Sequence, residues 1–407
     1  MSGPRRVIAP AMSRAQGRAR ALAEALASLD TPCELRLPDG ETISFGAGAP
    51  AFRLCVVGDR LLKRPVTEFS LARAYVEGDL DVEGDVMALL GIRDVLARGT
   101  PARQVVRLAA QLTLLAPTVV NRRAIRDHYS FGDDFYLTFL DARYHFYSQC
   151  LFASDDQTLE QAAENKLESM HEALGLRPGM RVLDIGGGWG GLTEYCAKRG
   201  VHVTSLTLTN SSAAFIRRRM EAQGLSAEVR VEDILEHRPA APYDHAVIFG
   251  VIEHIPTYRR FCSQLWAALK PGGRLYLDAS ATTEKYAVSP FTRAYTWHGP
   301  HSCLALQDLT RELLFHGFEV VRVRRETRDY ELTMRHWAER LEEAQDRLIA
   351  EGREPLYRAF RAFLWGGTHA FRTNRLQAYS VVAERRTDPG LRPGPARRLS
   401  HGLLALR

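Results

Sequence analysis

The stretch Val182-Leu183-Asp184-Ile185-Gly186-Gly187-Gly188-Trp189-Gly190-Gly191 decides how this chain folds. The apolar run from Met180 to Ile185 predicts a buried strand of a parallel sheet. The run ends in glycines, and a helical pattern follows from Leu192. Because glycine has no side chain, a ligand can approach the backbone there, and the next helix offers unpaired N–H groups at its start. This order of elements predicts a ligand-binding turn between a strand and a helix.

The spacing of the glycines indicates which ligand the turn binds. In dinucleotide-binding turns the third glycine falls five residues after the first. Here Gly186-x-Gly188-x-Gly190 has even spacing, and Asp184 lies two residues upstream of the first glycine. This arrangement is typical of the loop that binds S-adenosylmethionine (SAM) in Rossmann-like methyltransferases. A lone glycine loop is a weak signal, so a plain strand-to-helix turn is the alternative.

Further strands follow along the chain. β-Branched residues over 203–209 predict the second strand of the same sheet, Ala246–Gly250 predicts the fourth, and Gly273–Asp278 predicts the fifth. Helical patterns separate these strands, which predicts an α/β fold with a doubly wound, mostly parallel sheet of the Rossmann-like methyltransferase type. Such sheets bind their ligands at the carboxyl ends of the strands, where we expect the site.

The chain divides into segments of different composition. Residues 21–100 mix short strands with helices and predict a small N-terminal α+β domain. Residues 101–127 predict an amphipathic helical connector, and residues 128–384 predict the methyltransferase domain. Within that domain, an irregular aromatic stretch over 281–303 predicts a lid over the carboxyl edge of the sheet. Long helical patterns over 331–374 are expected to add a helical cover over an apolar acyl groove, with ordinary packing between helices as the alternative.

Several motifs resemble the cyclopropane-fatty-acyl-phospholipid synthase family, and they occur in the order found in that family. They are the run His128–Tyr136, Tyr147-Ser148, the segment from Thr158 through Lys166-Leu167 to Met180, the glycine loop with Trp189, Glu253-His254, and Asp329-Tyr330. Upstream, Ala72–Val82 resembles the family's smaller N-terminal domain. The resemblance runs from residue 40 to residue 384, and several ordered motifs are far more specific than one glycine loop.

The resemblance implies a SAM-dependent C-methyltransferase that acts on the double bond of an unsaturated fatty acyl chain, with a phospholipid as the expected carrier. In this family the alkene attacks the sulfonium methyl, a bound bicarbonate ion removes a proton from the added methyl, and a ring closes. The resemblance implies Glu253 and Tyr330 as catalytic residues. It also implies SAM contacts at Tyr147, Ser148, Asp184, Gly186, Gly188, Trp189, Gly190, Thr207, Leu208 and Asp233.

Four positions depart from the family's pattern. Gln149 replaces a cysteine, Asp278 a histidine, Ser212 a glutamine, and Gly367 a second cysteine. The first two changes argue against bicarbonate as a cofactor, because a carboxylate at 278 beside Glu253 would repel an anion. Both Gln149 and Asp278 are therefore candidate catalytic residues, and Asp278 with Glu253 is expected to supply the base. The alternative is that Asp278 caps the following turn.

Positive charge is concentrated at the two ends of the 407-residue chain, whose formal net charge is +6. Residues 1–20 hold five arginines and no acidic residue, and residues 385–407 are also arginine-rich. Both ends are rich in proline and glycine and are expected to be a disordered head and tail. They suit an anionic membrane surface, with solubilising tails as the alternative. Nucleic acid is not an expected partner, because aromatic–basic strand motifs are absent from the sequence.

The remaining features bear on location and assembly. No stretch approaches the ~20 apolar residues that span a bilayer, and no secretory signal is recognisable. The six cysteines have no paired spacing, which predicts reduced thiols and no metal site. We expect a cytoplasmic protein that associates peripherally with the membrane, and a homodimer is compatible with the sequence.

Three other functions remain open at this point. One is formation of a methyl- or methylene-branched fatty acid without ring closure. Another is C-methylation or cyclopropanation of a soluble natural-product alkene. The third is a SAM-binding, non-catalytic partner of an oxidoreductase, against which the presence of Glu253 and Tyr330 argues.

Overall fold

The structure is a computed structural model, and it describes the following residues: 14–58, 60–61, 65–96, 131–255, 257–284, 289–297, 302–388 and isolated positions between 393 and 400. The connector predicted over 101–127 lies outside the described residues, as does most of both predicted tails. Backbone contacts divide the chain into two compact units. Unit 1 comprises Met1–Val105 and Gln345–Gly366, and unit 2 comprises Val106–Ala344 and Gly367–Arg407.

Unit 1 is built on a four-stranded sheet with the strand order β2-β1-β3-β4, in which only β1 and β3 run parallel. This confirms the α+β character predicted for the N-terminal region. Its elements are α1 (Arg14–Ala27), β1 (Cys33–Arg36), β2 (Thr42–Phe45), β3 (Phe52–Val56), α2 (Glu68–Val76), β4 (Leu80–Gly84), α3 (Val86–Leu89), the 3-10 helix η2 (Leu90–Asp94), α14 (Gln345–Ala350) and part of α15 (Glu354–Arg372).

Two features of unit 1 differ from expectation. Helix α1 begins at Arg14, so residues 14–20 are helical rather than disordered, because the same helix buries Leu22 and Leu26 in the core of this unit. The segment Gln345–Gly366, expected within the methyltransferase domain, joins unit 1 instead. There Arg361 donates to the Tyr75 hydroxyl at 2.9 Å, a contact between residues far apart in the sequence.

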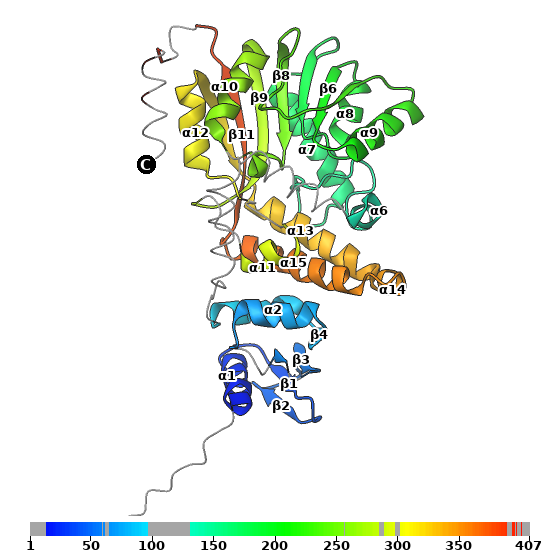
Figure 1. Ribbon diagram of the computed structural model, residues 1–407, viewed down its shortest axis with the longest axis vertical. Coiled ribbons are helices and arrows are strands. Elements are labelled where there is room, and N and C mark those ends of the chain that lie inside the picture. The colour runs from blue at the N-terminus through cyan, green and yellow to red at the C-terminus, as the bar shows by residue number, and fades with distance from the viewer. Residues whose placement is uncertain are drawn as a thin grey trace, which may run out of the picture. The chain divides into compact units, whose positions relative to one another are not determined.

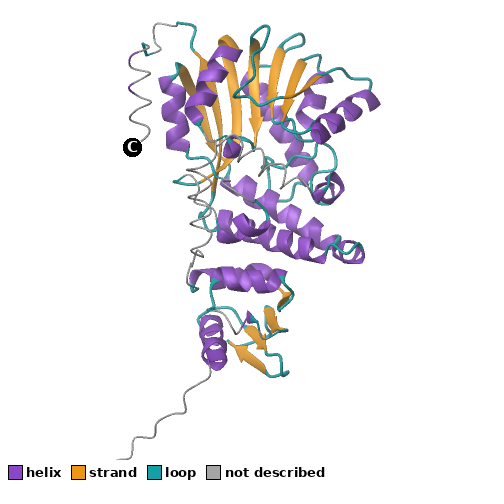
Figure 2. Cartoon of the chain, viewed as in Figure 1, coloured by secondary structure: helices purple, strands orange, loops and turns teal. Residues whose placement is uncertain are grey.

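Unit 2 contains a seven-stranded sheet with the order β10-β11-β9-β8-β5-β6-β7 (Figures 1 and 2). Only β11 runs antiparallel to its neighbours, so the predicted doubly wound, mostly parallel sheet is confirmed. The strands are β5 (Arg181–Ile185), β6 (His202–Thr207), β7 (Glu228–Val231), β8 (Tyr243–Phe249), β9 (Leu269–Ala281), β10 (Phe318–Arg325) and β11 (Gln377–Arg385).

Helices follow the strands of unit 2 as the sequence pattern predicts. They are α6 (Asp133–Leu137), α7 (Leu159–Leu174), α8 (Gly191–Ala197), α9 (Asn210–Ala222), the 3-10 helix η4 (Ile252–His254), α10 (Tyr258–Ala268), α11 (Pro290–Tyr295), α12 (Leu306–Phe315) and α13 (Thr327–Glu343). Thr158 and Gln161 form the capping box that opens α7. Part of the predicted lid, including residues 285–288 and 298–301, lies outside the described residues. No helix in the described ranges is long and apolar enough to cross a membrane.

The sheet of unit 2 positions the site because β5 pairs with β6 on one side and with β8 on the other. The chain order reverses at β5, and ligands of such sheets bind at the carboxyl ends of the strands beside this reversal. Leu183, Ile248 and Leu277 from the middle of β5, β8 and β9 are fully buried and form one core. A rigid core therefore supports the strand ends that carry the candidate residues.

Candidate active site

The glycine loop after β5 leaves open space at one position. The N–H groups of Gly186 and Gly187 both donate to the Leu206 carbonyl of β6 at 2.9 Å, which ties the loop to the sheet. A Cβ at Gly186 would collide with Val251, so glycine is required there by packing. A Cβ at Gly188 would meet no atom closer than 4.0 Å, and its φ of +53° favours glycine. Gly188 therefore exposes bare backbone at the carboxyl edge of the sheet.

Asp184, two residues before the glycine loop, holds the elements around the loop together. Its carboxylate is buried and accepts hydrogen bonds from Thr193 of α8 at 2.9 Å and Ser205 of β6 at 3.0 Å. Burial raises the pKa of Asp184 to about 6, although the two hydroxyl groups oppose this rise. Asp184 thus joins three elements around the glycine loop.

Trp189 and the start of α8 complete the loop. The Trp189 indole is buried and donates to the Asp133 carboxylate of α6 at 2.9 Å. Gly190 has φ of +84° and passes the chain into α8. The aromatic residue in the glycine loop therefore anchors α6, and its predicted contact with SAM stays a prediction.

The neighbouring strand ends carry the other predicted cofactor contacts. Thr207 ends β6 and is buried, and Leu208 follows it half-buried. Asp233 lies two residues beyond β7 and accepts the Leu235 N–H at 2.9 Å. Ser212 replaces the family's glutamine. Its backbone N–H donates to the hydroxyl of Thr209, the N-cap residue of α9. Thr207, Leu208 and Asp233 therefore follow the carboxyl ends of two neighbouring parallel strands.

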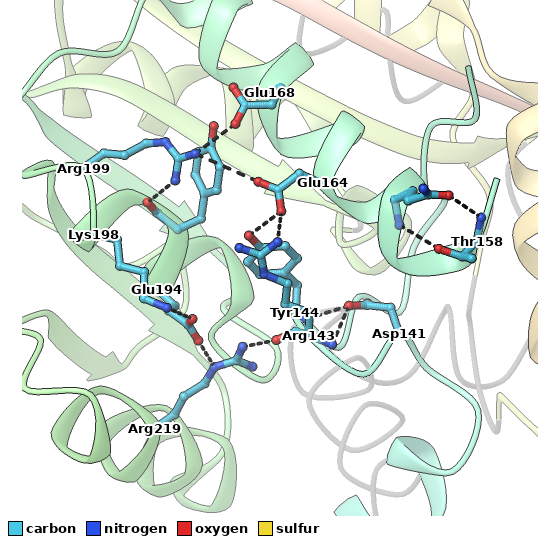
Figure 3. A network of polar contacts seen from close by, with 12 residues as sticks. Asp141, Arg143, Tyr144, Thr158, Glu164, Glu168, Glu194, Lys198, Arg199 and Arg219 are labelled. Carbon is cyan, nitrogen blue, oxygen red and sulfur yellow. Dashed lines mark hydrogen bonds and ion pairs between the residues drawn. The ribbon is translucent and has the colours of Figure 1, made fainter. Parts of the chain in front are cut away.

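The segment before Tyr147 is held in place by polar contacts (Figure 3). The Asp141 carboxylate accepts the N–H groups of Arg143 at 3.2 Å, Tyr144 at 2.5 Å and Phe146 at 2.7 Å. His145 has φ of +61°, which is uncommon for a residue other than glycine. The Asp141 contacts hold this turn, which leads directly into Tyr147.

Arg219 of α9 contacts both Glu194 of α8 and the segment before Tyr147 (Figure 3). Its guanidinium pairs with Glu194 of α8 at 2.6 Å, donates to the Trp189 carbonyl at 3.1 Å and donates to the Arg143 carbonyl. One partly buried cation therefore links two segments that carry predicted cofactor contacts.

Lys166 of α7 is the centre of a second polar cluster. Its buried ammonium contacts the Asp278 carboxylate at 2.8 Å, the Ser148 hydroxyl at 2.6 Å and the Gln149 carbonyl at 2.9 Å. The other Asp278 oxygen accepts the Gly250 N–H at 2.9 Å. Burial raises the pKa of Asp278, while Lys166 and the Gly250 N–H oppose the rise. Both oxygens of Asp278 are therefore engaged at the end of β9.

Gln149 extends this cluster toward α13. Its side-chain amide donates to the buried Glu326 carboxylate at 3.1 Å, and the Ser380 hydroxyl of β11 donates to the same carboxylate at 2.5 Å. Burial and the charge of Asp278 raise the pKa of Glu326. Glu326 lies one turn before Tyr330, so Gln149 is connected to the helix that carries a predicted catalytic residue.

Glu253 differs from these acids because one of its oxygens is available. It lies in η4 after β8, is buried, and accepts both the N–H and the hydroxyl of Ser280 with Oε1, at 3.0 and 3.1 Å. Oε2 has no hydrogen-bond partner among the described residues. Burial, assisted by the charge of Asp278, raises the pKa of Glu253 to about 7. A carboxyl with this pKa can take up or release a proton near neutral pH.

Aromatic rings surround the Tyr330 side chain. The Tyr330 ring stacks on Phe371 with centroids 4.5 Å apart, and its centroid lies 6.3 Å from that of Trp337. The ring centroids of Trp337 and Tyr147 lie 5.3 Å apart. Burial raises the pKa of Tyr330 well above its usual value, and the charge of Glu253 adds to the rise. The structure thus brings Tyr147 and Tyr330 together with Trp337 and Phe371 in one aromatic region, and places the charge of Glu253 near Tyr330.

Comparisons with known proteins identify the family. A family model described as mycolic acid cyclopropane synthetase matches residues 118–381, which is more than half of the chain. The chain belongs to this family. It is 29% identical to the probable fatty acid methyltransferase of Pseudomonas putida over 381 residues, which cover 89% of this chain and 94% of that protein.

More distant relatives fit the same assignment. Identity to the cyclopropane-fatty-acyl-phospholipid synthase of Escherichia coli (strain K12) is 29% over 272 residues, which cover 66% of this chain and 69% of that protein. The cyclopropane synthase MmaA2 from Mycobacterium tuberculosis superposes with a TM-score of 0.59 at 25% identity, covering 65% of this chain and 98% of that one. CmaA1, solved in complex with SAH and CTAB, gives 0.60 with the same identity and coverage. The protein is a SAM-dependent methyltransferase of the cyclopropane fatty acid synthase type.

The site of this family member fits SAM. Gly188 offers bare backbone where a Cβ would enter open space, and the adjoining α8 presents its N-terminus. The segments carrying Tyr147 and the glycine loop are fixed to each other by Arg219. Individual contacts with SAM remain predictions.

The charges around Glu253 disfavour a bicarbonate ion, and its absence from the site stays a prediction. The negative charge of Asp278 raises the pKa of both Glu253 and Glu326. An added anion would therefore meet further repulsion from these carboxylates. Lys166 cannot offset this repulsion freely, because its ammonium already donates to three acceptors.

The structure also gives packing reasons for three further residues near the site. Cys150 is fully buried, and its N–H donates to Thr333 of α13 at 2.9 Å, which fits a packing role. A Cβ at Gly367 would collide with the Met334 side chain, so methionine fills the space next to this position. Burial lowers the pKa of His254 to about 4, and its ring packs on Trp297 at 4.5 Å.

The residues that sequence analysis did not identify as site residues are Lys166, Ser280 and Glu326. Lys166 had one usable signal: it lies on the stripe of buried α7 residues formed by Ala163, Leu167 and Met170. A charged residue on such a stripe needs a buried partner. Ser280 and Glu326 carried no comparable pattern.

Proposed function

We propose that this chain transfers a methyl group from SAM to the double bond of an unsaturated fatty acyl chain carried by a membrane phospholipid. The names of the relatives support an acyl substrate. Glu253 carries the proposal, because it is a buried carboxyl beside aromatic rings with one oxygen unpartnered among the described residues. A peripheral position on the membrane follows from the lipid substrate.

SAM, when bound, supplies an electrophilic methyl group to the alkene. The glycine loop from Gly186 to Gly190 would hold it with bare backbone, together with Thr207, Leu208 and Asp233 on the neighbouring strand ends. Tyr147 and Ser148 would contact it from the segment fixed by Asp141. The task of these residues is to bind and orient, because the transfer is direct and needs no covalent enzyme intermediate.

The residues around Glu253 would then control the charged substrate. The alkene π electrons would form the new C–C bond as the S–CH3 bond of SAM breaks, so S-adenosylhomocysteine would leave and the acyl chain would become positively charged. The rings of Tyr147, Tyr330 and Trp337 stabilise positive charge without supplying a nucleophile. Oε2 of Glu253 takes a proton from the added methyl group, and the electrons of that C–H bond close the ring. A general base of this kind accounts for roughly 10²–10⁴-fold in rate.

Asp278 and Gln149 would act through other residues. Both oxygens of Asp278 are occupied by Lys166 and Gly250, so it is better suited to position the cluster than to accept a proton from substrate. The base function expected for Asp278 together with Glu253 is thus assigned to Glu253 alone. Gln149 positions Glu326 at the start of α13.

Lipid analysis of a host that expresses the chain tests the proposal. We expect unsaturated acyl chains to gain the mass of one CH2, and Glu253→Gln to lower this gain by roughly 10²–10⁴-fold while SAM binding persists. Glu312→Gln is the control, because Glu312 is a buried glutamate of α12 outside the proposed site. Normal product from Glu253→Gln would refute the role of Glu253, and an absence of lipid product would refute the substrate class.

The same samples separate the alternative products. A cyclopropane ring keeps its mass on mild hydrogenation, whereas a methylene branch gains two hydrogens. Formation of the methylene-branched product would retain the methyl transfer but replace ring closure with a 1,2-hydride shift and proton loss from the added methyl group.

A further inference from the structure

The outermost strand β10 presents both apolar and basic side chains to solvent. It pairs with β11 on one side only and forms one edge of the sheet of unit 2. Val321 is 51% exposed and Val323 is 44% exposed. Arg322, Arg324 and Arg325 are exposed as well. Five consecutive residues of one strand therefore combine two apolar and three cationic side chains at the surface.

A β-bulge contributes to this exposure. The register with β11 shifts between Val320 and Arg322, so Val321 lies outside the regular pairing. A bulge bends the strand and redirects its side chains. Val321 thus stays in solvent even though it lies within a strand that otherwise follows the sheet.

The charges of the β10 arginines are offset only in part within the described part of the chain, because Arg324 interacts electrostatically with the buried Glu326 and Asp329. None of Arg322, Arg324 and Arg325 forms an ion pair there. At the opposite edge of the sheet, β7 has an exposed valine too, but its Arg230 pairs with Glu228 at 2.5 Å. Of the two edges, the β10 edge therefore joins exposed valines to arginines that form no salt bridge among the described residues.

A groove adjoins this strand. It has a volume of about 650 Å³, and Arg311 and Leu314 of α12 and Tyr379 of β11 contribute to its lining. Tyr379 is the pairing partner of Arg325, which places the groove beside the end of β10. Leu314 is 47% exposed and extends the apolar surface.

We propose that β10 and the end of α12 form a docking surface for the anionic lipid of a membrane, an inference that rests on the proposed function because the substrate is then a membrane lipid. Guanidinium groups bind lipid phosphates in a bidentate manner, and valines enter the interface between head groups and acyl chains. A second copy of the chain fits this edge poorly, because antiparallel pairing of two β10 strands would bring arginines together.

Sedimentation of the full chain with vesicles tests the surface. The probes are vesicles of phosphatidylcholine alone and of equal parts phosphatidylcholine and phosphatidylglycerol. We expect binding to the anionic vesicles only, and roughly 100-fold weaker binding after the triple change Arg322→Gln, Arg324→Gln and Arg325→Gln. Replacing Val321 and Val323 by serine should weaken binding several-fold at constant charge.

A matched triple variant controls for net charge. Arg177→Gln, Arg218→Gln and Arg260→Gln remove three exposed arginines from other parts of unit 2 and should leave binding near that of the wild type. Equal loss in both triple variants would overturn the proposal in favour of a general charge effect. Unchanged binding of the β10 triple variant would overturn it as well.

The readout separates this proposal from the proposed function, because vesicle binding requires no turnover. Methyl transfer to a detergent-dispersed unsaturated phospholipid should be the same in the β10 triple variant and the wild type, while transfer to vesicle lipid should fall. Lost transfer to dispersed lipid would overturn a pure docking role. Absence of transfer by the wild type would contradict the proposed function and leave the binding result standing.

Discussion

Replacing Lys166 by methionine isolates the energetic weight of the buried ion pair with Asp278. The side chains of Lys166 and Asp278 are 1% and 2% exposed and lie 2.8 Å apart. Methionine keeps most of the volume but removes the charge and leaves a buried carboxylate without its cation. Loss of one partner of such a pair costs about 3–5 kcal/mol of folding free energy. Lys270 offers a control of the same type, because its pair with Asp244 at 2.6 Å is 45% and 21% exposed and is worth at most about 1 kcal/mol.

The destabilisation of Lys166→Met should grow with pH. Burial already raises the pKa of Asp278, and removal of the ammonium removes the strongest opposing influence. The folded variant then retains a proton that the unfolded chain releases above its ordinary pKa of about 3.9. Since the folded state binds more protons, its stability falls by about 1.4 kcal/mol per pH unit until the folded pKa of Asp278 is passed.

Urea unfolding followed by tryptophan fluorescence measures the effect in unit 2. Of the five tryptophans, four lie in that unit: Trp189, Trp266, Trp297 and Trp337. The variants are Lys166→Met, Asp278→Asn and the double change. We expect the double variant to lose less stability than the sum of the single losses, with an interaction energy of about 1–3 kcal/mol. Additivity within about 0.5 kcal/mol, or equal losses for Lys166→Met and Lys270→Met, would refute the reasoning.

Three further outcomes follow from the same structure. Glu253→Gln should stabilise the fold above pH 7 by up to about 3 kcal/mol, because folding raises the pKa of Glu253 from 4.5 to about 7. The destabilisation that this rise causes in the wild type is absent below pH 4.5 and reaches its full size above pH 7. A stability difference between variant and wild type that does not change with pH in urea titrations would contradict this. Gly188→Ala should abolish SAM binding in calorimetry, whereas Gly175→Ala, with a similar left-handed φ of +62° and open space at its Cβ, should share only the backbone strain of roughly 1 kcal/mol. Gly367→Cys should lower stability by about 1–3 kcal/mol through its clash with Met334, and adding Met334→Ala should recover part of that loss. A Gly367→Cys protein as stable as the wild type would show that the Met334 side chain can move aside without cost, which would contradict this prediction.

Much of the fold could be predicted because its signals are local. The apolar run before Gly186 marks β5. The glycines that follow either have a left-handed backbone conformation or leave no room for a Cβ, so the glycine pattern itself indicates the loop. The Thr158 capping box requires only residues three positions apart. Helix α1 was missed over residues 14–20, because arginine content predicted disorder while buried leucines further along the helix decided the outcome.

The candidate site also has parts that local sequence signals predict and parts that depend on tertiary packing. Motifs in their order along the chain determined which family the protein belongs to, the SAM loop after β5, and Glu253 and Tyr330 as candidates. The sequence could not determine that Lys166 and Asp278, 112 positions apart, share a buried ion pair, because their contact depends on how α7 packs against the end of β9. Asp278 therefore reads from the sequence as an available carboxylate, and only the tertiary structure shows both of its oxygens engaged. Local spacing is written into the chain, whereas the protonation and partners of a buried charge follow from the groups that folding brings within a few ångströms of it.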